Sequence, residues 1–303
     1  MKKSIKLGVM LAILAATLYA INSPLSKLLL DYISPTLTAG FLYLGAGLGM
    51  GCIALIKKVK KTERKESNLT RAELPYTVAM VLLDICAPIC LLFGLNSISP
   101  ANASLLNNFE IVATAIIALM IFKEKISLRL WIGIAFVTLS CLTLSIEDFS
   151  SLNFSYGSLF VLLACVCWGF ENNCTKKISS KDPLQIVLIK GLCSGLGSTV
   201  MGFIIGEKIT VIWSVFATLL VGFVAYGLSI FFYVYAQRLL GAARTSAYYA
   251  VAPFIGTALS ILIFPAIPHF TYFIALALMV IGAWLCSSDE PIFKKKSIKK
   301  KID

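Results

Sequence analysis

Ten apolar segments divide this chain, and short polar or basic stretches separate them. Each segment runs for about 18 residues or more, and a helix needs roughly 20 residues to cross the hydrocarbon core of a bilayer. The segments are residues 6–24, 35–56, 74–95, 100–122, 128–146, 156–174, 184–206, 211–235, 242–264 and 267–287. The pattern predicts an all-α integral membrane protein with ten transmembrane helices.

The basic residues fall almost entirely on one side of this predicted topology. Of the 27 lysines and arginines, all but Lys27, Lys190 and Lys208 lie in the terminal segments or in loops on the same side as the termini. Cytoplasmic loops carry such an excess of positive charge. We therefore expect both termini in the cytoplasm and the protein in the cytoplasmic membrane. The first apolar segment resembles a secretory signal that ends near Ala20, but its pattern returns in mid-chain, which favours a retained first helix.

The repeated pattern indicates two related halves. Residues 8–27, GVMLAILAATLYAINSPLSK, align with residues 157–176, GSLFVLLACVCWGFENNCTK. Because five spans per half is an odd number, the halves are expected to cross the membrane with opposite topology, as in transporters built from inverted repeats. The expected organisation is a first five-helix repeat at 1–146, an extracytoplasmic linker at 147–155, a second five-helix repeat at 156–288 and a basic cytoplasmic tail at 289–303.

Composition excludes several other classes of protein. The 303 residues are 58% hydrophobic and 14% charged, with a mean hydropathy of +0.88, which does not fit a soluble domain. The net charge of +12 lies in loops, so a lipid bilayer rather than nucleic acid is the expected partner. The nine cysteines lack zinc-site spacing, and no nucleophile motif such as G-x-S-x-G occurs. We expect no metal or other cofactor, no catalytic residues and no enzymatic activity, although an integral membrane enzyme and an ion channel remain the alternatives.

A carboxylate near the middle of the fourth apolar segment, Glu110, points to a functional cavity. A charged residue at the centre of a membrane helix costs roughly 2.5 to 3.5 kcal/mol, so it usually faces a protein interior or a wet cavity. Asn107, Glu110 and Thr114 share one helical face, which predicts a polar wall. Asp84 in the third segment reaches a similar depth, so the two carboxylates are expected to share one cavity that holds a cation or a proton.

A buried ion pair and an aromatic set complete the candidate site. Glu171 and Lys190 have similar predicted depths and are expected to pair. Aromatic faces opposite carboxylates suit a cationic or zwitterionic amine, although ordinary packing is the alternative role for each ring. The candidate substrate- or ion-binding residues are Glu110, Asp84, Asn107, Asn108, Asn22, Glu171, Lys190, Trp168, Tyr226, Tyr248 and Tyr249.

Four stretches carry a resemblance to a known family. They are YAINSP at 19–24, WGFENN at 168–173, PANASLLNNFEIVATAIIALMIFKEK at 100–125 and RLLGAARTSAYYAVAPFIGTAL at 238–259. Over about residues 6–287 the chain resembles the EamA family of the drug/metabolite transporter superfamily. Glu124 resembles a glutamate that is usual there in the family, but the corresponding stretch of the second half, FPAIPHF, lacks it, so Glu124 is expected to be a structural charge at a helix end.

The resemblance and the candidate site together predict a function. We expect a secondary transporter that moves a small polar metabolite, an amino acid or an organic amine, across the cytoplasmic membrane by alternating access. Proton coupling and uncoupled facilitation both remain open. The sequence does not predict the oligomeric state.

Overall fold

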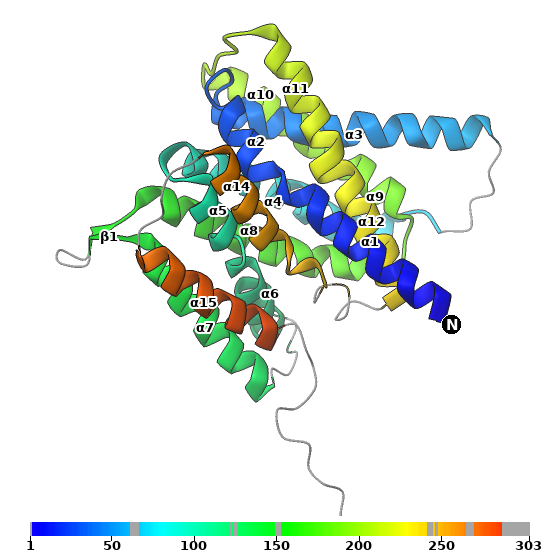
Figure 1. Ribbon diagram of the computed structural model, residues 1–303. Helices are drawn as coiled ribbons and strands as arrows, with labels where there is room; N and C mark the ends of the chain where they lie inside the picture. Colours follow the sequence, from blue (N-terminus) through cyan, green and yellow to red (C-terminus); the bar gives the residue numbers. More distant parts are fainter. Residues whose placement is uncertain are drawn as a thin grey trace, which may run out of the picture.

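The computed structural model describes residues 2–60, 67–121, 123, 127–148, 153–240, 245, 248–264 and 270–286, and these residues are almost entirely helical (Figure 1). Glu124 and the predicted basic tail at 289–303 lie outside the described residues, as do residues 149–152 of the predicted linker.

The first half of the chain contains seven helices and a 3₁₀ turn in its described residues. They are α1 (Lys2–Ala20), α2 (Asn22–Leu29), α3 (Pro35–Val59), the 3₁₀ turn η1 (Arg71–Glu73), α4 (Leu74–Ser97), α5 (Pro100–Leu106), α6 (Phe109–Met120) and α7 (Leu128–Ser145). Two short antiparallel strands follow, β1 (Ile146–Asp148) and β2 (Asn153–Phe154).

The second half is likewise helical and includes two π-helical segments. Its described elements are α8 (Tyr156–Ile178), α9 (Pro183–Ile189), the π segment η2 (Lys190–Ser194), α10 (Gly195–Ile204), α11 (Ile212–Gly222), the π segment η3 (Phe223–Leu228), α12 (Ser229–Leu240), α14 (Ala252–Ile263) and α15 (Phe270–Cys286).

Within the described residues, seven helical stretches are long and apolar enough to cross a membrane, three fewer than the ten segments predicted from sequence. They are Ile5–Leu29, Pro35–Val59, Arg71–Ser97, Pro100–Met120, Tyr156–Ile178, Pro183–Ile204 and Ile212–Ala236. The other three predicted segments correspond to the shorter apolar helices Leu128–Leu144, Ala252–Ile263 and Phe270–Leu285. The protein is therefore a helical, multi-pass membrane protein, while the count of ten spans stays a prediction.

Capping side chains explain why several predicted segments begin where they do. Ser99 accepts a hydrogen bond from the Asn102 N–H at the start of α5, and Asp182 accepts one from the Leu184 N–H at the start of α9. Pro100 and Pro183 follow as the first helical residues. A side-chain acceptor followed by proline is a strong helix-start signal, because it satisfies a free N–H and presets the backbone angle.

Several of the predicted continuous helices are interrupted in the described structure, including 6–24, which breaks at Ile21 between α1 and α2. Residues 100–122 break at Asn107–Asn108, where the Asn108 and Glu110 N–H groups donate to carbonyls three residues back rather than four. The segments 184–206 and 211–235 contain η2 and η3. An apolar run specifies where a helix can lie in the membrane but not its local hydrogen-bond register, so sequence pattern alone does not predict these interruptions.

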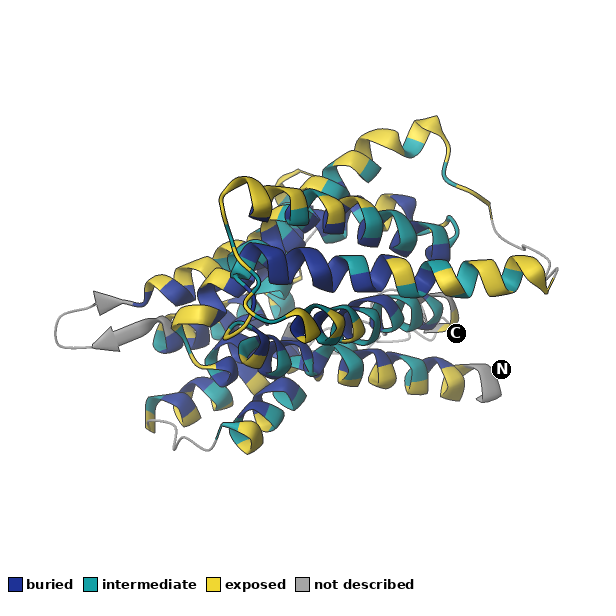
Figure 2. Cartoon of the chain, turned by 90° about the horizontal axis from the view of Figure 1, so that it is seen from above, coloured by how far each residue is buried: buried dark blue, intermediate teal, exposed yellow. Residues whose placement is uncertain are grey.

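The helices pack in pairs that join distant parts of the chain. α4 lies along α8, α1 along α12, and α7 along α15, while α3 packs against α10, α11 and both π segments (Figure 1). Glycines allow the close approach of α3, because a Cβ added at Gly47 would lie 2.6 Å from the Leu192 backbone nitrogen. Buried residues line the facing sides of the helices, and exposed residues lie on their outer sides (Figure 2).

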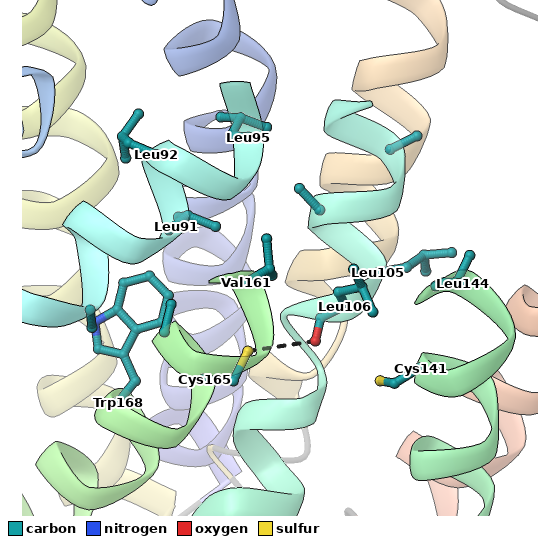
Figure 3. Close-up of a cluster of buried hydrophobic side chains, with 14 of the residues drawn as sticks. Leu91, Leu92, Leu95, Leu105, Leu106, Cys141, Leu144, Val161, Cys165 and Trp168 are labelled. Atoms are coloured by element: carbon teal, nitrogen blue, oxygen red, sulfur yellow. Dashed lines mark hydrogen bonds between the residues drawn. The ribbon is translucent and has the colours of Figure 1, made fainter. Parts of the chain in front are cut away.

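The largest apolar core lies where α4, α5, α7 and α8 meet (Figure 3). Its buried members include Leu91, Leu92, Leu105, Leu106, Cys141, Val161, Cys165 and Trp168. This core fixes α8 against α4 and against the break between α5 and α6. Two of the charged residues described next, Asp84 and Glu171, lie on α4 and α8.

Candidate functional site

Lys190 links carboxylates from both halves of the chain. Its ammonium nitrogen lies 2.9 Å from Oε1 of Glu171 in α8 and 3.2 Å from Oδ2 of Asp84 in α4. All three residues are buried, with at most 5% of their surface exposed. The predicted Glu171–Lys190 pair is therefore confirmed, and Asp84 is a third member that the sequence did not indicate. We call Asp84, Glu171 and Lys190 the charged cluster.

The two carboxylates of the charged cluster have different surroundings. Glu171 receives a hydrogen bond from Lys190 and another from the Thr175 hydroxyl on the same oxygen. Asp84 receives a hydrogen bond from the Tyr43 hydroxyl at 2.9 Å on Oδ1, whereas its buried Oδ2 receives no hydrogen bond of acceptable geometry in the described structure. Lys190 thus forms an ion pair with both carboxylates, at 2.9 Å and with a well-aligned hydrogen bond to Glu171 and at 3.2 Å to Asp84.

Glu110 lies next to the charged cluster but has a neutral partner. The Asn172 amide of α8 donates to Oε1 of Glu110 at 2.6 Å and also lies 3.4 Å from the Thr114 hydroxyl. Glu110 is within electrostatic range of Glu171 and Lys190. Among the described residues, no lysine or arginine forms a salt bridge with Glu110. The predicted common face of Glu110 and Thr114 is confirmed, and this face is turned toward α8.

Aromatic rings from several helices lie beside these carboxylates. The Tyr226 ring of η3 lies 4.9 Å from the Tyr43 ring and 5.9 Å from the Tyr19 ring, measured between centroids. Tyr226 also accepts a hydrogen bond from Asn22, at 3.2 Å. Tyr249 lies 6.0 Å from Tyr19 and is within electrostatic range of Glu110. The rings of Tyr43 and Tyr226 therefore lie beside Asp84, and those of Tyr19 and Tyr249 lie near Glu110.

The break between α5 and α6 lies against a thiol of α8. Cys165 donates toward the Leu106 carbonyl at 3.6 Å (Figure 3), and the backbone and side-chain oxygens of Asn107 lie at 3.8 and 3.9 Å from the same sulfur. The Glu110 N–H bonds to Asn107 instead of Leu106, so the Leu106 carbonyl has lost its usual helical partner. The thiol takes over part of that role.

Some of the predicted site residues are not brought together. Tyr248 is 40% exposed, whereas Trp168, a member of the apolar core, does contact the site through the side chain of Tyr43, which donates to Asp84. The Asn107 side chain faces Cys165, and Asn108 bonds to the Leu105 carbonyl while its own Oδ1 is buried without a partner in the described structure. Asp84, by contrast, joins the charged cluster.

The structure adds residues that sequence reasoning missed. Tyr43, Asn172, Thr175 and Tyr19 all contact the predicted acids or rings. Asn172 lies inside the WGFENN stretch and next to Glu171, so its position could have been flagged. Tyr43 gave no signal, because a tyrosine in an apolar segment is equally typical of packing.

Comparison with known proteins identifies the family of this chain. The model of the EamA-like transporter family matches residues 6–146 and 155–288. The chain belongs to this family. This EamA-like transporter is 26% identical over 208 residues to an uncharacterized transporter of Methanothermobacter thermautotrophicus, a match that covers 64% of the chain and only 59% of that relative's length.

A second relative matches most of this EamA-like transporter. The uncharacterized transporter YyaM of Bacillus subtilis is 22% identical over 277 residues, which cover 87% of the chain and 88% of YyaM. A solved crystal structure, described only as that of a protein, superposes with a TM-score of 0.62 at 17% identity, over 93% of the chain and 95% of its own. The family model shows that the chain belongs to the EamA-like transporter family, both relatives are named as transporters, and the likeness to the solved structure supports the fold alone.

Proposed function

We propose that this protein is a secondary transporter for a small polar metabolite that carries an amino group, an amino acid or an organic amine. The observation that carries the proposal is the set of the buried residues Asp84, Glu171 and Lys190 together with the partly buried Glu110 on apolar helices. This set contains three carboxyl groups and one ammonium group. Because uncompensated charge is costly within a membrane, a positively charged ligand or protons would stabilise the set.

Glu110 is the proposed binding partner for the ligand's positive charge. Its described partner Asn172 is neutral, so an arriving ammonium group would not need to displace a resident cation. Tyr19 and Tyr249 lie near it, and aromatic rings attract cations through their negative faces. Lys190 and Asn22 offer donors for a carboxylate or hydroxyl group elsewhere on the same ligand.

Alternating access between two inverted halves is the proposed mechanism. The two stretches matched by the family model correspond closely to the proposed repeats at 1–146 and 156–288. The packing is also consistent with a two-fold relation, because α4 on α8 and α12 on α1 would be equivalent pairs, and α7 would pack on its own counterpart α15. The charged cluster draws residues from both proposed halves, as a substrate site between repeats would.

Transport into proteoliposomes tests the proposal. The purified protein would be given a panel of radiolabelled L-amino acids, primary amines and polyamines, and saturable uptake of at least one of them is expected. Glu110→Gln keeps the acceptor for Asn172 but cannot ionise. We expect it to weaken apparent affinity by about 10- to 100-fold, since a hydrogen bond to a charged group contributes about 1.5 to 3 kcal/mol, with an almost unchanged melting temperature.

The matched control is Asp31→Asn, which removes an exposed carboxylate outside the cluster. Its uptake should equal that of the wild type. Wild-type affinity and pH profile in Glu110→Gln would contradict the role of Glu110. Conductance without saturation would favour a channel, and chemical conversion of a panel compound would favour an enzyme.

We also propose that the protein lies in the cytoplasmic membrane and that both of its termini face the cytoplasm. The basic residues Lys57, Lys58 and Lys60 at the end of α3 support it through the excess of positive charge expected on the inner side. A cysteine at Ser67 should react with a membrane-impermeant maleimide only after the cells are opened. Labelling of this position in intact cells would rule out the topology.

A further inference from the structure

We infer that Asp84 is the proton-binding group of this transporter and that Lys190 is an internal cation that alternates with the proton. The inference rests on the proposed function, because coupling requires transport, but its test requires no substrate. It would make the protein a proton-coupled transporter rather than a facilitator. Glu110 would keep the separate role of binding the substrate.

The first reason is that one carboxylate oxygen of Asp84, Oδ2, lacks a well-aligned hydrogen bond. Asp84 is fully buried, and its Oδ1 is held by the Tyr43 hydroxyl at 2.9 Å. Oδ2 has only the misaligned contact to Lys190 at 3.2 Å, with no directed hydrogen bond. A buried carboxylate oxygen that has an ion-pair contact but no well-aligned hydrogen bond is incompletely stabilised, so this atom is a position in the charged cluster where a proton would be favourable.

The second reason is that Lys190 already has a complete alternative partner. It donates to Glu171 at 2.9 Å, and Thr175 donates to the same carboxylate. When a proton from solvent binds Oδ2 of Asp84, Lys190 can move onto Glu171 without losing its counter-charge. The charged cluster then changes from a net charge of −1 to 0, and it returns to −1 when the proton leaves and Lys190 again approaches Asp84.

The backbone at Lys190 suits such a movement. Lys190 begins the π segment η2, which replaces regular α-helical hydrogen bonds over Lys190–Ser194. π segments occur frequently at functional sites, and a local change between π and α bonding would rotate the side chain. Asp84 and Glu171 belong to α4 and α8, which pack against each other, so a shift of Lys190 in η2 relative to these two helices would favour one partner over the other.

The groups that face Asp84 come from four elements. They are Tyr43 of α3, Lys190 of η2, Glu171 of α8 and Tyr226 of η3. Lys190 favours the ionised form of Asp84 and Glu171 favours the protonated form. Removing each of these two residues should therefore displace the titration of Asp84 in opposite directions.

Infrared difference spectroscopy of the purified full-length protein tests the inference. The carbonyl stretch of a protonated carboxyl group would be followed between about pH 5 and pH 9, a range that buried carboxyl groups can reach. Asp84→Asn should remove an absorption that Glu110→Gln retains. Lys190→Met should extend this absorption to more alkaline pH, and Glu171→Gln should confine it to more acidic pH.

Each outcome decides the inference. The absence of a titrating absorption in the wild type, its retention in Asp84→Asn, or its loss in Glu110→Gln would overturn it. If Lys190→Met does not fold, Glu171→Gln still gives the displacement, because Lys190 keeps its contact with Asp84. A failure to find saturable uptake would count against the proposed function, whereas the infrared result concerns only the proton.

Discussion

Replacing Lys190 by methionine should be among the most destabilising single changes in the membrane core. The substitution keeps the apolar stem but leaves Asp84 and Glu171, both almost fully buried, without their cation. Breaking a buried ion pair by removing one partner costs about 3 to 5 kcal/mol. At about 1.6 °C per kcal/mol for a chain of 303 residues, the melting temperature should fall by about 5 to 8 °C.

The double variant separates the ion pair from general damage. Glu171→Gln alone should cost only about 1 kcal/mol, because Lys190 keeps Asp84 and the glutamine can still accept from Thr175. Glu171→Gln with Lys190→Met leaves one unpaired carboxylate instead of two. It should therefore be more stable than Lys190→Met alone, and more stable than the sum of the single effects by about 2 kcal/mol.

The stability of all three variants is measured by thermal unfolding in detergent, in which the fraction of protein that stays monodisperse is recorded at each temperature. Lys58→Met is the control. Lys58 is exposed at the end of α3, so its replacement should change stability by less than about 0.5 kcal/mol. Additive effects in the double variant, within about 0.5 kcal/mol, would show that Glu171 and Lys190 do not interact and would refute the reasoning.

Two further predictions concern close packing and the break in the fourth apolar segment. Gly45→Ala places a Cβ 2.8 Å from the Leu219 Cα and should lower the stability by about 1 to 3 kcal/mol. The control Gly51→Ala in the same helix meets only a flexible side chain at 3.4 Å and should be tolerated. Equal melting temperatures of the two variants would contradict this prediction. Cys165→Ala should lose about 1 kcal/mol, because the Leu106 carbonyl loses its donor, whereas Cys165→Ser keeps a donor and should stay within about 0.5 kcal/mol of the wild type. The same pair of substitutions at the exposed Cys193 should have no effect, and a Cys165→Ser variant as unstable as Cys165→Ala would argue against the hydrogen bond.

Hydrophobic pattern predicts much of this fold because the membrane constrains length and polarity so strongly. The predicted segments 35–56, 74–95 and 156–174 correspond to α3, α4 and α8, with starts that agree within one residue. Helix ends were predicted too early, as at Ile178, since α8 continues through polar residues that are helical but not apolar. The starts of these helices are marked by caps or prolines, whereas no glycine marks the ends of α3, α4 and α8, in contrast to α10, which ends just before Gly206.

The candidate site was predictable only where depth along a helix was informative. Similar depth correctly paired Glu171 with Lys190, because a buried charge requires a nearby partner. Depth could not show that α4 packs on α8, so it missed Asp84 as the third member and Asn172 as the partner of Glu110. Which faces meet depends on side-chain packing across the whole bundle, and the sequence of one helix does not contain that information.

Irregular backbone and functional side chains coincide in this protein. Glu110 follows the break at Asn107–Asn108, and Lys190 and Tyr226 lie in π segments. Asp84 lies four residues before Pro88, whose missing N–H leaves the Asp84 carbonyl without a helical partner. Each irregularity frees a backbone polar group, which membrane helices tolerate only inside protein or beside a wet cavity. The four irregularities come from different helices and lie beside one set of carboxylates. A polar binding site would explain why they converge there, whereas helix packing alone would not.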